Sequence, residues 1–416
     1  MNLALHANTE CYQAIYNQKY DFMGQSYATL YPNLHKYPAT MLPQIGFELL
    51  CEFHASKTNI LDPFCGSGSS FTSAIKYGIK ECVGFDLNPL AIIINNVKFS
   101  FIERNDLLRQ KDILFENIKI KTDIKTNANP LNNITNCDFW IEKQAQLDLS
   151  SIFYHISNIK DEKIKNIFTL AFSETLREAS YTRNNEFKLF RMKNYQTYFP
   201  NTFEIFKEKT AKLINDYLTY YQPQARYISH IVYNSCFKDI DKKFDTILTS
   251  PPYGDSKTTV AYGQFSTFIN EWLGFKDARQ LDSKLMGGKK SETLYNQGVM
   301  KDFILEISKI DSKRALEVSS YYYDLESSIK TLANAVNKNG KIFFVVGNRK
   351  VKNIALPTDK FIAEAFCKEG FTHITTIKRK ISNKVMPKLN SPTNKTGKLS
   401  QTINDEYIIV CKKSEF

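Results

Sequence analysis

The sequence predicts an α/β fold in which a seven-stranded sheet carries largely helical insertions. Two observations lead to this prediction. Short apolar runs alternate with helical patterns over residues 59–98, and the same alternation resumes at residue 226 and continues to residue 412. Alternation of this kind is typical of a doubly wound, mostly parallel sheet. At 416 residues the chain is long enough to bury a large core and to hold a second lobe.

The expected elements of the core follow from residue type and spacing. Seven runs of strand-like composition form the sheet: residues 59–64, 81–86, 226–233, 244–249, 341–346, 373–381 and 406–412. Four stretches with apolar residues at helical spacing form helices: residues 42–53, 71–77, 313–337 and 358–368. The third helix is expected to stop at Lys338-Asn339-Gly340.

Two stretches interrupt the alternation. Residues 105–136 are polar and rich in Lys and Asn, which indicates a loop or a peripheral element. Residues 139–188 and 202–221 carry apolar side chains at helical spacing, so the insert between residues 99 and 225 is expected to be largely helical. A second insert runs from residue 254 to residue 310.

The strand at residues 244–249 ends at Ser250-Pro251-Pro252-Tyr253-Gly254. Two consecutive prolines can neither donate to a sheet nor continue a helix, so the strand stops there. Its last carbonyls are left without sheet partners, beside a serine hydroxyl and a tyrosine ring. Such a corner is suited to binding the amino group of a planar base. The alternative is that the proline pair only ends the strand and has no role in binding.

A glycine-rich turn, Cys65-Gly66-Ser67-Gly68-Ser69-Ser70, separates the first core strand from a helix. It lets a ligand approach the backbone closely, with the helix N-terminus facing the ligand. About twenty residues on, the next strand ends at Asp86, where a carboxylate suits the two hydroxyls of a ribose. The turn lacks the third glycine of the dinucleotide pattern GxGxxG.

These motifs resemble those of the amino-group DNA methyltransferases. Asp62-Pro63-Phe64-Cys65-Gly66-Ser67-Gly68 is similar to their S-adenosylmethionine (SAM) motif. Ser250-Pro251-Pro252-Tyr253 is similar to their catalytic motif, in the form most often associated with cytosine N4 methylation. Four further segments resemble the ribose-binding strand end (residues 84–89), the adenine contact (231–235), the segment closing over the methionine part of SAM (36–41) and a subgroup extension of the catalytic motif (253–265).

The resemblance implies a Rossmann-like seven-stranded methyltransferase sheet, SAM as cofactor and no metal. The implied catalytic residues are Ser250, Pro251, Pro252 and Tyr253. The implied cofactor-binding residues are Tyr37, Pro38, Asp62, Pro63, Phe64, Cys65, Gly66, Gly68, Asp86, Leu87, Asn234 and Ser235. In one arrangement common in this family the catalytic motif comes first, whereas here the SAM motif precedes it.

The resemblance also divides the chain into four parts. Residues 1–58 form an N-terminal arm with the helix that closes over the cofactor, and residues 59–98, 226–253 and 311–416 form the catalytic core. Residues 99–225 are the candidate DNA-recognition insert, and residues 254–310 are a candidate target-recognition loop.

The residue types suit methyl transfer to an exocyclic amino group, which is a poor nucleophile because its lone pair is conjugated with the ring. If the amino group donates hydrogen bonds to the Ser250 side chain and the Pro251 carbonyl, its lone pair is freed for attack. Flipping the base out of a duplex costs a few kcal/mol, and stacking on Tyr253 returns about 1–3 kcal/mol. Transfer to cytosine carbon 5 is disfavoured, because it needs a cysteine nucleophile and the chain has no Pro-Cys pair.

Charge favours a polyanionic partner. Lys and Arg total 55 against 43 Asp and Glu, a formal net charge of +12, and each cation set against a phosphate releases counterions. Double-stranded DNA is the expected partner, and a companion restriction endonuclease or a second methyltransferase is left open. The candidate DNA-binding residues are Arg177, Ser180, Arg183, Lys188, Lys257, Lys378, Arg379 and Lys384. For residues 177–188 the alternative is a helix end followed by a polar loop, and for residues 378–384 it is a solvated strand end.

The eight cysteines form no CxxC pair, and the six histidines show no metal spacing. Reduced thiols in a cytoplasmic protein are expected. A signal pattern is not found at the N-terminus and no run of about 18 apolar residues occurs, so neither secretion nor membrane spanning is expected.

Three hypotheses remain at the level of the sequence. The first is a DNA methyltransferase acting on cytosine N4. The second keeps the enzyme but makes the substrate adenine N6 of DNA or a base in RNA. The third is a non-catalytic SAM-fold subunit that binds nucleic acid, and the presence of both the Ser250–Tyr253 motif and the Gly66–Gly68 turn speaks against it.

Overall fold

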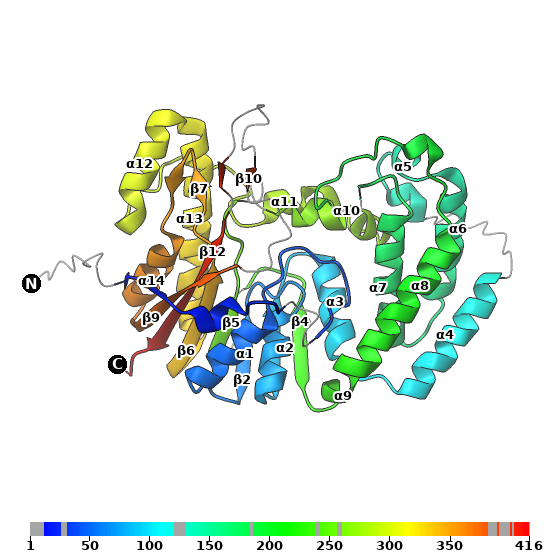
Figure 1. The fold of residues 1–416 in the computed structure, drawn as a ribbon, viewed down its shortest axis with the longest axis horizontal. Helices are drawn as coiled ribbons and strands as arrows, with labels where there is room; N and C mark the ends of the chain where they lie inside the picture. Colours follow the sequence, from blue (N-terminus) through cyan, green and yellow to red (C-terminus); the bar gives the residue numbers. More distant parts are fainter. Residues whose placement is uncertain are drawn as a thin grey trace, which may run out of the picture.

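A central sheet and a helical lobe make up the protein, as a computed structural model shows (Figure 1). The structure describes residues 12–25, 31–119, 130–183, 186–237, 242–255, 260–381, 389–390, 400–401 and 403–415.

The central sheet has eight strands in the order β1-β9-β12-β6-β5-β2-β3-β4. Their bounds are β1 (Ile15–Tyr16), β2 (Asn59–Asp62), β3 (Glu81–Phe85), β4 (Ser229–Tyr233), β5 (Phe244–Thr249), β6 (Val336–Val346), β9 (Phe371–Lys380) and β12 (Asp405–Lys413). The run from β4 to β6 is parallel, and β12 lies antiparallel to both β6 and β9. All seven expected strands are present. The eighth, β1, pairs only two residues with β9, too few to leave a strand pattern in the sequence.

The expected boundary after the long helix is wrong. Helix α13 (Ser312–Asn334) ends earlier than expected, and residues 336–340 extend β6 instead of closing the helix. The reason is packing, since Val336 is buried and pairs with Phe244 of β5. Asn339 takes a left-handed conformation at φ 63° within this extension, which marks the irregularity that the sequence suggested as a helix stop.

Alternate residues of the strands enter two different cores. Ile60, Phe343 and Ile408 belong to one buried cluster, and their neighbours Leu61, Phe344 and Ile409 belong to the other. This period of two is what a sheet covered on both faces requires. The helices packed beside the sheet are α1 (Pro43–Glu52), α2 (Ser69–Tyr77), α3 (Pro89–Phe99), α13 and α14 (Thr358–Lys368).

The insert between β3 and β4 is the helical lobe on the right of Figure 1. It contains α4 (Arg104–Lys119), α5 (Cys137–Trp140), α6 (Lys143–Ser157), α7 (Glu162–Glu178) and α8 (Thr202–Asp216), followed by a π-helical segment (Tyr217–Tyr221) and α9 (Gln222–Ala225). Of the two alternatives for the stretch from residue 105, a loop is wrong for residues 105–119, which form α4, and a peripheral element fits this helix at the outer edge of the lobe (Figure 1). Its buried face is a thin stripe of Leu107, Leu114 and Ile118, which the surrounding charged residues conceal in the sequence.

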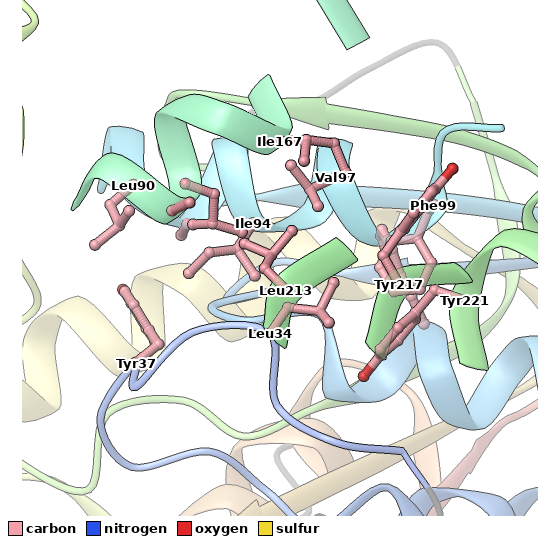
Figure 2. Packing of buried hydrophobic residues seen from close by; sticks show 14 of the residues in the cluster. Leu34, Tyr37, Leu90, Ile94, Val97, Phe99, Ile167, Leu213, Tyr217 and Tyr221 are labelled. Atoms are coloured by element: carbon pink, nitrogen blue, oxygen red, sulfur yellow. The ribbon is translucent and has the colours of Figure 1, made fainter. Parts of the chain in front are cut away.

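The two lobes share one core (Figure 2). Leu90, Ile94, Val97 and Phe99 of α3 meet residues of the helical lobe, and Leu34 of the N-terminal arm joins the same cluster. The lobe residues in that contact are Ile167, Leu213, Tyr217 and Tyr221. This continuous packing fixes the helical lobe against the sheet beside α3.

The insert between β5 and α13 contains α10 (Tyr262–Trp272), α11 (Leu281–Lys284) and α12 (Lys301–Ile310). Helices α10 and α11 lie between the lobes in Figure 1, whereas α12 lies beside α13 at the upper left. Trp272 of α10 packs against Phe153 and Phe172 of the helical lobe, with ring centroids 5.7 and 5.0 Å apart. Helix α10 therefore ties the second insert to the helical lobe.

The remaining elements are short. Two-stranded pairs are formed by β7 (Lys350–Val351) with β8 (Ile354–Ala355) and by β10 (Leu389–Asn390) with β11 (Ser400–Gln401). Single 3-10 turns occur at Gln18–Asp21, Pro130–Asn133, Tyr195–Thr197, Ala278–Gln280 and Gly298–Met300. Of the helices in the described ranges, none combines the length and the hydropathy needed to span a bilayer.

Candidate cofactor and catalytic site

A cavity of about 390 Å³ lies where β2, β3 and β5 end. Carboxyl ends of parallel strands meet at one edge of a sheet, which is where ligands bind in open α/β folds. The cavity gathers segments that are far apart in the sequence. Its lining includes Tyr37, Pro38, Asp62, Pro63, Phe64, Cys65, Gly66, Asp86, Leu87, Ser235, Ser250 and Pro252 from the predicted site.

The glycine turn after β2 folds as its residues require. Gly66 and Gly68 both have left-handed backbones, at φ 45° and 80°. Gly68 does not line the cavity. A Cβ at Gly68 would lie 2.5 Å from Oδ1 of Asn95 in α3, so this glycine allows α2 and α3 to approach closely. Asn95 in turn donates to the Gly66 carbonyl at 2.8 Å.

Asp86 holds the turn and faces the cavity. Its carboxylate accepts the Gly66 N–H at 2.9 Å and the Asn88 N–H at 2.8 Å. Burial raises the pKa of Asp86 to about 6. Asn234, predicted to contact the cofactor, instead donates from its side chain to the Asp86 carbonyl at 3.1 Å and does not line the cavity.

Asp62 couples the cofactor turn to the catalytic strand. Its carboxylate accepts the Thr249 hydroxyl at 2.6 Å and the Phe64 N–H at 3.0 Å, and the Ser70 hydroxyl also donates to it. Burial raises the pKa of Asp62 to about 6, although these hydrogen bonds favour the ionised form. Since Thr249 directly precedes Ser250, the same carboxylate fixes both halves of the site.

Tyr262 lines the cavity but was not among the predicted site residues. Its ring stacks on Tyr37 with centroids 5.8 Å apart and an interplanar angle of 29°. The Tyr37 hydroxyl accepts from the Asn88 side chain at 3.1 Å. The feature of the sequence that could have identified Tyr262 is its position within residues 253–265, the segment that resembles a subgroup extension of the catalytic motif.

The opposite wall comes from the second insert and from α13. Lys284, Leu285 and Met286 line it together with Asp324, Ser327, Ser328, Thr331 and Leu332. Phe237 lines the cavity beyond Ser235 and packs edge-on against Phe85 at 5.1 Å. No local pattern in the sequence could have found these residues, because only the packing of α13 beside the sheet brings them to the cavity.

The catalytic corner presents its residues in two directions. Ser250 and Pro252 line the cavity, whereas the half-buried Tyr253 and the buried Pro251 are not among its lining residues. The Pro252 carbonyl accepts the Tyr321 hydroxyl at 2.7 Å. Among the residues that the structure describes, none donates to the Pro251 carbonyl.

The loop that follows Tyr253 is held by a buried ion cluster. Asp255 is 1% exposed and lies 2.6 Å from Arg314 and 2.8 Å from Arg349. A Cβ on Gly254 would lie 2.1 Å from the Arg349 guanidinium, so the glycine makes room for the arginine. Gly254 and Asp255 are thereby held in place directly after the corner.

The predicted DNA-binding residues fall into four groups, of which the fourth, Lys378 and Arg379, lies on β9. Arg177 and Ser180 serve the protein interior: Arg177 donates to the Phe265 carbonyl at 3.1 Å, and the buried Ser180 donates to the Arg177 carbonyl at 2.7 Å. Arg183 and Lys188 are exposed, with Arg183 paired to Glu186 at 3.0 Å. Lys257 and Lys384 lie outside the described residues.

Residues 378–380 belong to β9, so the strand expected at residues 373–381 is confirmed and the basic loop considered for residues 378–380 is wrong. Lys378 pairs with Asp405 at 3.0 Å on the neighbouring strand. Arg379 has a side chain only 3% exposed and forms an ion pair with Glu406. Strand pairing draws this arginine inward, away from any phosphate at the surface.

Arg191 is a further basic residue that the sequence did not single out. Its guanidinium lies 3.4 Å from the centre of the Tyr195 ring and 4.1 Å from that of Phe139. Within the described residues it has no carboxylate partner, and its buried Nε has no acceptor. The neighbouring Leu189 N–H donates to Gln264 of α10 at 3.3 Å, so this segment adjoins the helix that carries Tyr262.

Two of the described histidines and cysteines, His35 and Cys65, are buried in the protein interior. His35 is buried with its Nε2 2.8 Å from the Ser173 hydroxyl, and burial lowers its pKa to about 4. Burial also raises the pKa of the Cys65 thiol. Among the described residues, no group of three or more His, Cys, Asp or Glu is arranged to hold a metal ion.

Two known proteins are similar to this chain. It is 36% identical over 429 residues to the type II methyltransferase M.MvaI of Kocuria varians, a match covering 95% of this chain and 94% of the relative. It is 24% identical over 176 residues to the type II methyltransferase M.MjaII of Methanocaldococcus jannaschii, covering 42% of this chain and 31% of that relative. No protein-family model matches. The first likeness extends over nearly the whole chain, so it includes the inserts as well as the sheet.

Proposed function

Because the chain belongs to the type II DNA methyltransferases, we propose that it transfers the methyl group of SAM to the exocyclic amino group of a flipped base, namely N4 of cytosine in a specific DNA sequence. The observation that carries the proposal is one cavity lined by both the glycine turn with Asp86 and the Ser250-Pro252 corner. A methyl donor and an acceptor amine bound in that cavity would meet there. The sheet is then the Rossmann-like sheet of SAM methyltransferases, with β1 as an added edge strand.

The lining fits SAM in its chemistry. The Asp86 carboxylate suits the ribose hydroxyls, and the ring of Phe237 with the apolar Leu87 suits an adenine base. Tyr37, stacked on Tyr262 and joined to Asn88, suits closure over the methionine part. SAM supplies a methyl group already activated by its positive sulfur, so positioning and charge stabilisation by the protein dominate catalysis.

Ser250 and Pro251 are proposed to hold the amino group of the base. The Ser250 side chain lines the cavity, and the Pro251 carbonyl has no donor among the described residues. Two fixed acceptors for the two N–H groups favour the tetrahedral nitrogen whose lone pair attacks the methyl carbon. Tyr253 adds a face on which the flipped base stacks.

The choice of cytosine N4 rests on Ser250 in the catalytic motif. The second candidate is adenine N6 of DNA or a base in RNA, and a non-catalytic nucleic-acid-binding subunit is the third. The cavity itself favours catalysis over the third candidate, because Asp62 joins the cofactor turn to the residue preceding Ser250.

DNA recognition is proposed for the two inserts, residues 99–225 and 254–310. Arg183, Lys188 and Arg191 lie on one segment that adjoins α10, next to the catalytic corner. A net charge of +12 supports binding to a polyanion. The division into an arm, a core and two inserts stays part of this proposal, as do a cytoplasmic location and a companion restriction endonuclease.

Incubation with isotope-labelled SAM and either unmethylated DNA or RNA, followed by nucleoside mass spectrometry, tests the proposal. Labelled N4-methylcytosine in DNA is the expected result. Labelled N6-methyladenine, or label only in RNA, would contradict cytosine N4 as the target and support the second candidate. SAM binding without any labelled nucleoside would favour the non-catalytic subunit.

A further inference from the structure

Behind the catalytic corner, Ser250, Tyr253, Glu406 and Arg379 form a continuous chain of contacts. The Ser250 hydroxyl donates to the Tyr253 hydroxyl at 3.2 Å, and the Tyr253 hydroxyl donates to Oε1 of Glu406 at 2.9 Å. Oε2 of Glu406 forms an ion pair with Arg379. Glu406 lies on β12 and Arg379 lies opposite it on β9, more than a hundred residues from the catalytic motif.

The directions of these hydrogen bonds follow from the ionised carboxylate. A carboxylate only accepts, so the Tyr253 hydroxyl gives its proton to Glu406. The Tyr253 oxygen then has only lone pairs for Ser250, so Ser250 must donate to it. The lone pairs of Ser250 are thereby left for an N–H group in the cavity, which the side chain lines. These hydrogen bonds therefore fix the direction in which the Ser250 hydroxyl donates its proton.

The chain is held in place on each side. The Arg379 side chain is 3% exposed and donates to the Tyr20 carbonyl, so its charge is fixed beside Glu406. A Cβ on Gly347 would lie 2.8 Å from the Tyr253 ring, so the strand end packs closely against that ring. Burial raises the pKa of Tyr253 well above its ordinary value, which keeps the phenol protonated and able to donate.

We propose that Ser250 and Tyr253 relay the proton released by the methylated amino group to Glu406, which Arg379 holds in position. The proposal rests on the proposed amino-group methyl transfer and names residues for a step that this transfer requires. Glu406 does not touch the base, so it is a positioning residue that also receives the proton through two hydroxyls.

The step balances as follows. The amino nitrogen forms a bond to the methyl carbon as the carbon–sulfur bond breaks, and SAM leaves as a neutral thioether. The nitrogen now carries the positive charge and loses one proton to the Ser250 oxygen. Ser250 passes its own proton to Tyr253, and Tyr253 passes its proton to Glu406, which becomes neutral. The Glu406 side chain is 15% exposed, so it can return the proton to water after each turnover.

Three variants separate a relay from a structural contact. Tyr253→Phe keeps the ring for stacking but removes the hydroxyl. Glu406→Gln keeps an acceptor for Tyr253 but cannot take up the proton. Asp405→Asn is the matched control, because it removes the neighbouring ion pair with Lys378 and leaves Tyr253 and Glu406 in contact.

The measurements are the dissociation constants for SAM and DNA and the single-turnover methylation rate, in H₂O and in D₂O. Loss of acid–base assistance is worth about 100-fold or more in rate, so we expect Tyr253→Phe and Glu406→Gln each to lower the rate by about 100-fold. Both dissociation constants should stay unchanged, and the double variant should be no slower than either single one. The wild-type rate should fall in D₂O, and that dependence should be absent in Tyr253→Phe. Asp405→Asn should react at the wild-type rate.

A near-wild-type rate for Glu406→Gln, together with an equal wild-type rate in both solvents, would overturn the relay while leaving the methyltransferase proposal intact. Weakened SAM binding in both variants would assign the contacts a structural role only, and would also overturn it. If the wild-type protein labels no nucleic acid, the proposed function fails and the relay fails with it.

Discussion

Asp86 stands at the end of β3 with both carboxylate oxygens already accepting backbone N–H groups, from Gly66 and Asn88. Each oxygen keeps a further lone pair for a ligand hydroxyl. The carboxylate therefore shapes the turn before any ligand arrives, and the same atoms face the cavity. A residue that does both cannot be replaced without disturbing the turn.

A pH dependence of SAM binding follows from this carboxylate. Burial raises the pKa of Asp86 to about 6 from 3.8, so the group is ionised above pH 6 and becomes neutral below it. We expect SAM affinity, measured by calorimetry, to be constant above about pH 7 and to fall as the pH drops through 6. Asp62, whose pKa is also raised to about 6, should contribute to the same decline.

Asp86→Asn provides the comparison. This variant should bind SAM weakly at every pH and show a smaller pH dependence, due to Asp62 alone. Wild-type affinity that stays constant down to pH 5 would contradict the role assigned to these carboxylates.

Tyr253 and Asp86 should separate catalysis from cofactor binding. Removal of a stacking ring costs about 1–3 kcal/mol per base, so Tyr253→Ala should lower methyl transfer by at least about tenfold below Tyr253→Phe, which keeps the ring, while SAM affinity is retained. Asp86→Ala should weaken SAM binding first. Equilibrium binding and single-turnover rates on the same preparations distinguish the two effects, and near-wild-type transfer by Tyr253→Ala would remove the stacking role.

At the scale of elements, the corner after β5 depends on its neighbours for its shape. Tyr321 of α13 holds the Pro252 carbonyl, and Arg314 of the same helix meets Asp255 together with Arg349. Pro252 and Asp255, on either side of Tyr253, are therefore anchored to α13, and Asp255 is also anchored to the segment after β6. A helix distant in sequence thus holds the residues beside the proposed catalytic motif.

Asp255→Ala should be strongly destabilising. It leaves two arginines facing each other, with side chains only 11% and 10% exposed, and breaking a buried ion pair from one side costs about 3–5 kcal/mol. Urea unfolding should show a loss of this size. Asp277→Ala, which removes an exposed pair with Lys284, is the control and should change the unfolding midpoint little. Equal stability of the two variants would show that the cluster does not hold the loop.

At the scale of the whole molecule, the proposed DNA contacts predict a salt dependence. The chain carries a net charge of +12, and each phosphate contact adds about 0.9 to the slope of log affinity against log salt concentration. Arg191 packs on aromatic rings but has no ion-pair partner among the described residues, so a phosphate contact would break no ion pair.

Arg191→Ala should weaken DNA binding and reduce that slope by about 1, whereas Arg191→Lys should retain much of the slope. Arg109→Ala is the matched control, since Arg109 is 74% exposed on α4 and already paired with Asp106. Titration of labelled DNA at several salt concentrations measures both effects. Equal affinities for the Arg191 and Arg109 variants would place the DNA elsewhere.

The sequence by itself determined the features that contiguous residues create. A proline pair ends β5 because it lacks N–H donors, and glycines at positions 66 and 68 permit left-handed backbones. Such local rules predict the seven strands and the order of the glycine turn, Asp86 and the proline corner along the chain. Most of the cofactor-binding residues predicted from these motifs line the cavity. Helix α4 was not predicted as a helix, because only three of its apolar residues form its buried face.

Only the tertiary structure decided which distant residues meet. The pairing of β9 with β12 sets Arg379 against Glu406, and that register draws an expected surface arginine into the protein behind Tyr253. The packing of α10 against the arm stacks Tyr262 on Tyr37, and α13 brings a wall to the cavity. Contacts of this kind depend on strand register and helix packing over hundreds of residues, and no short stretch of sequence encodes them.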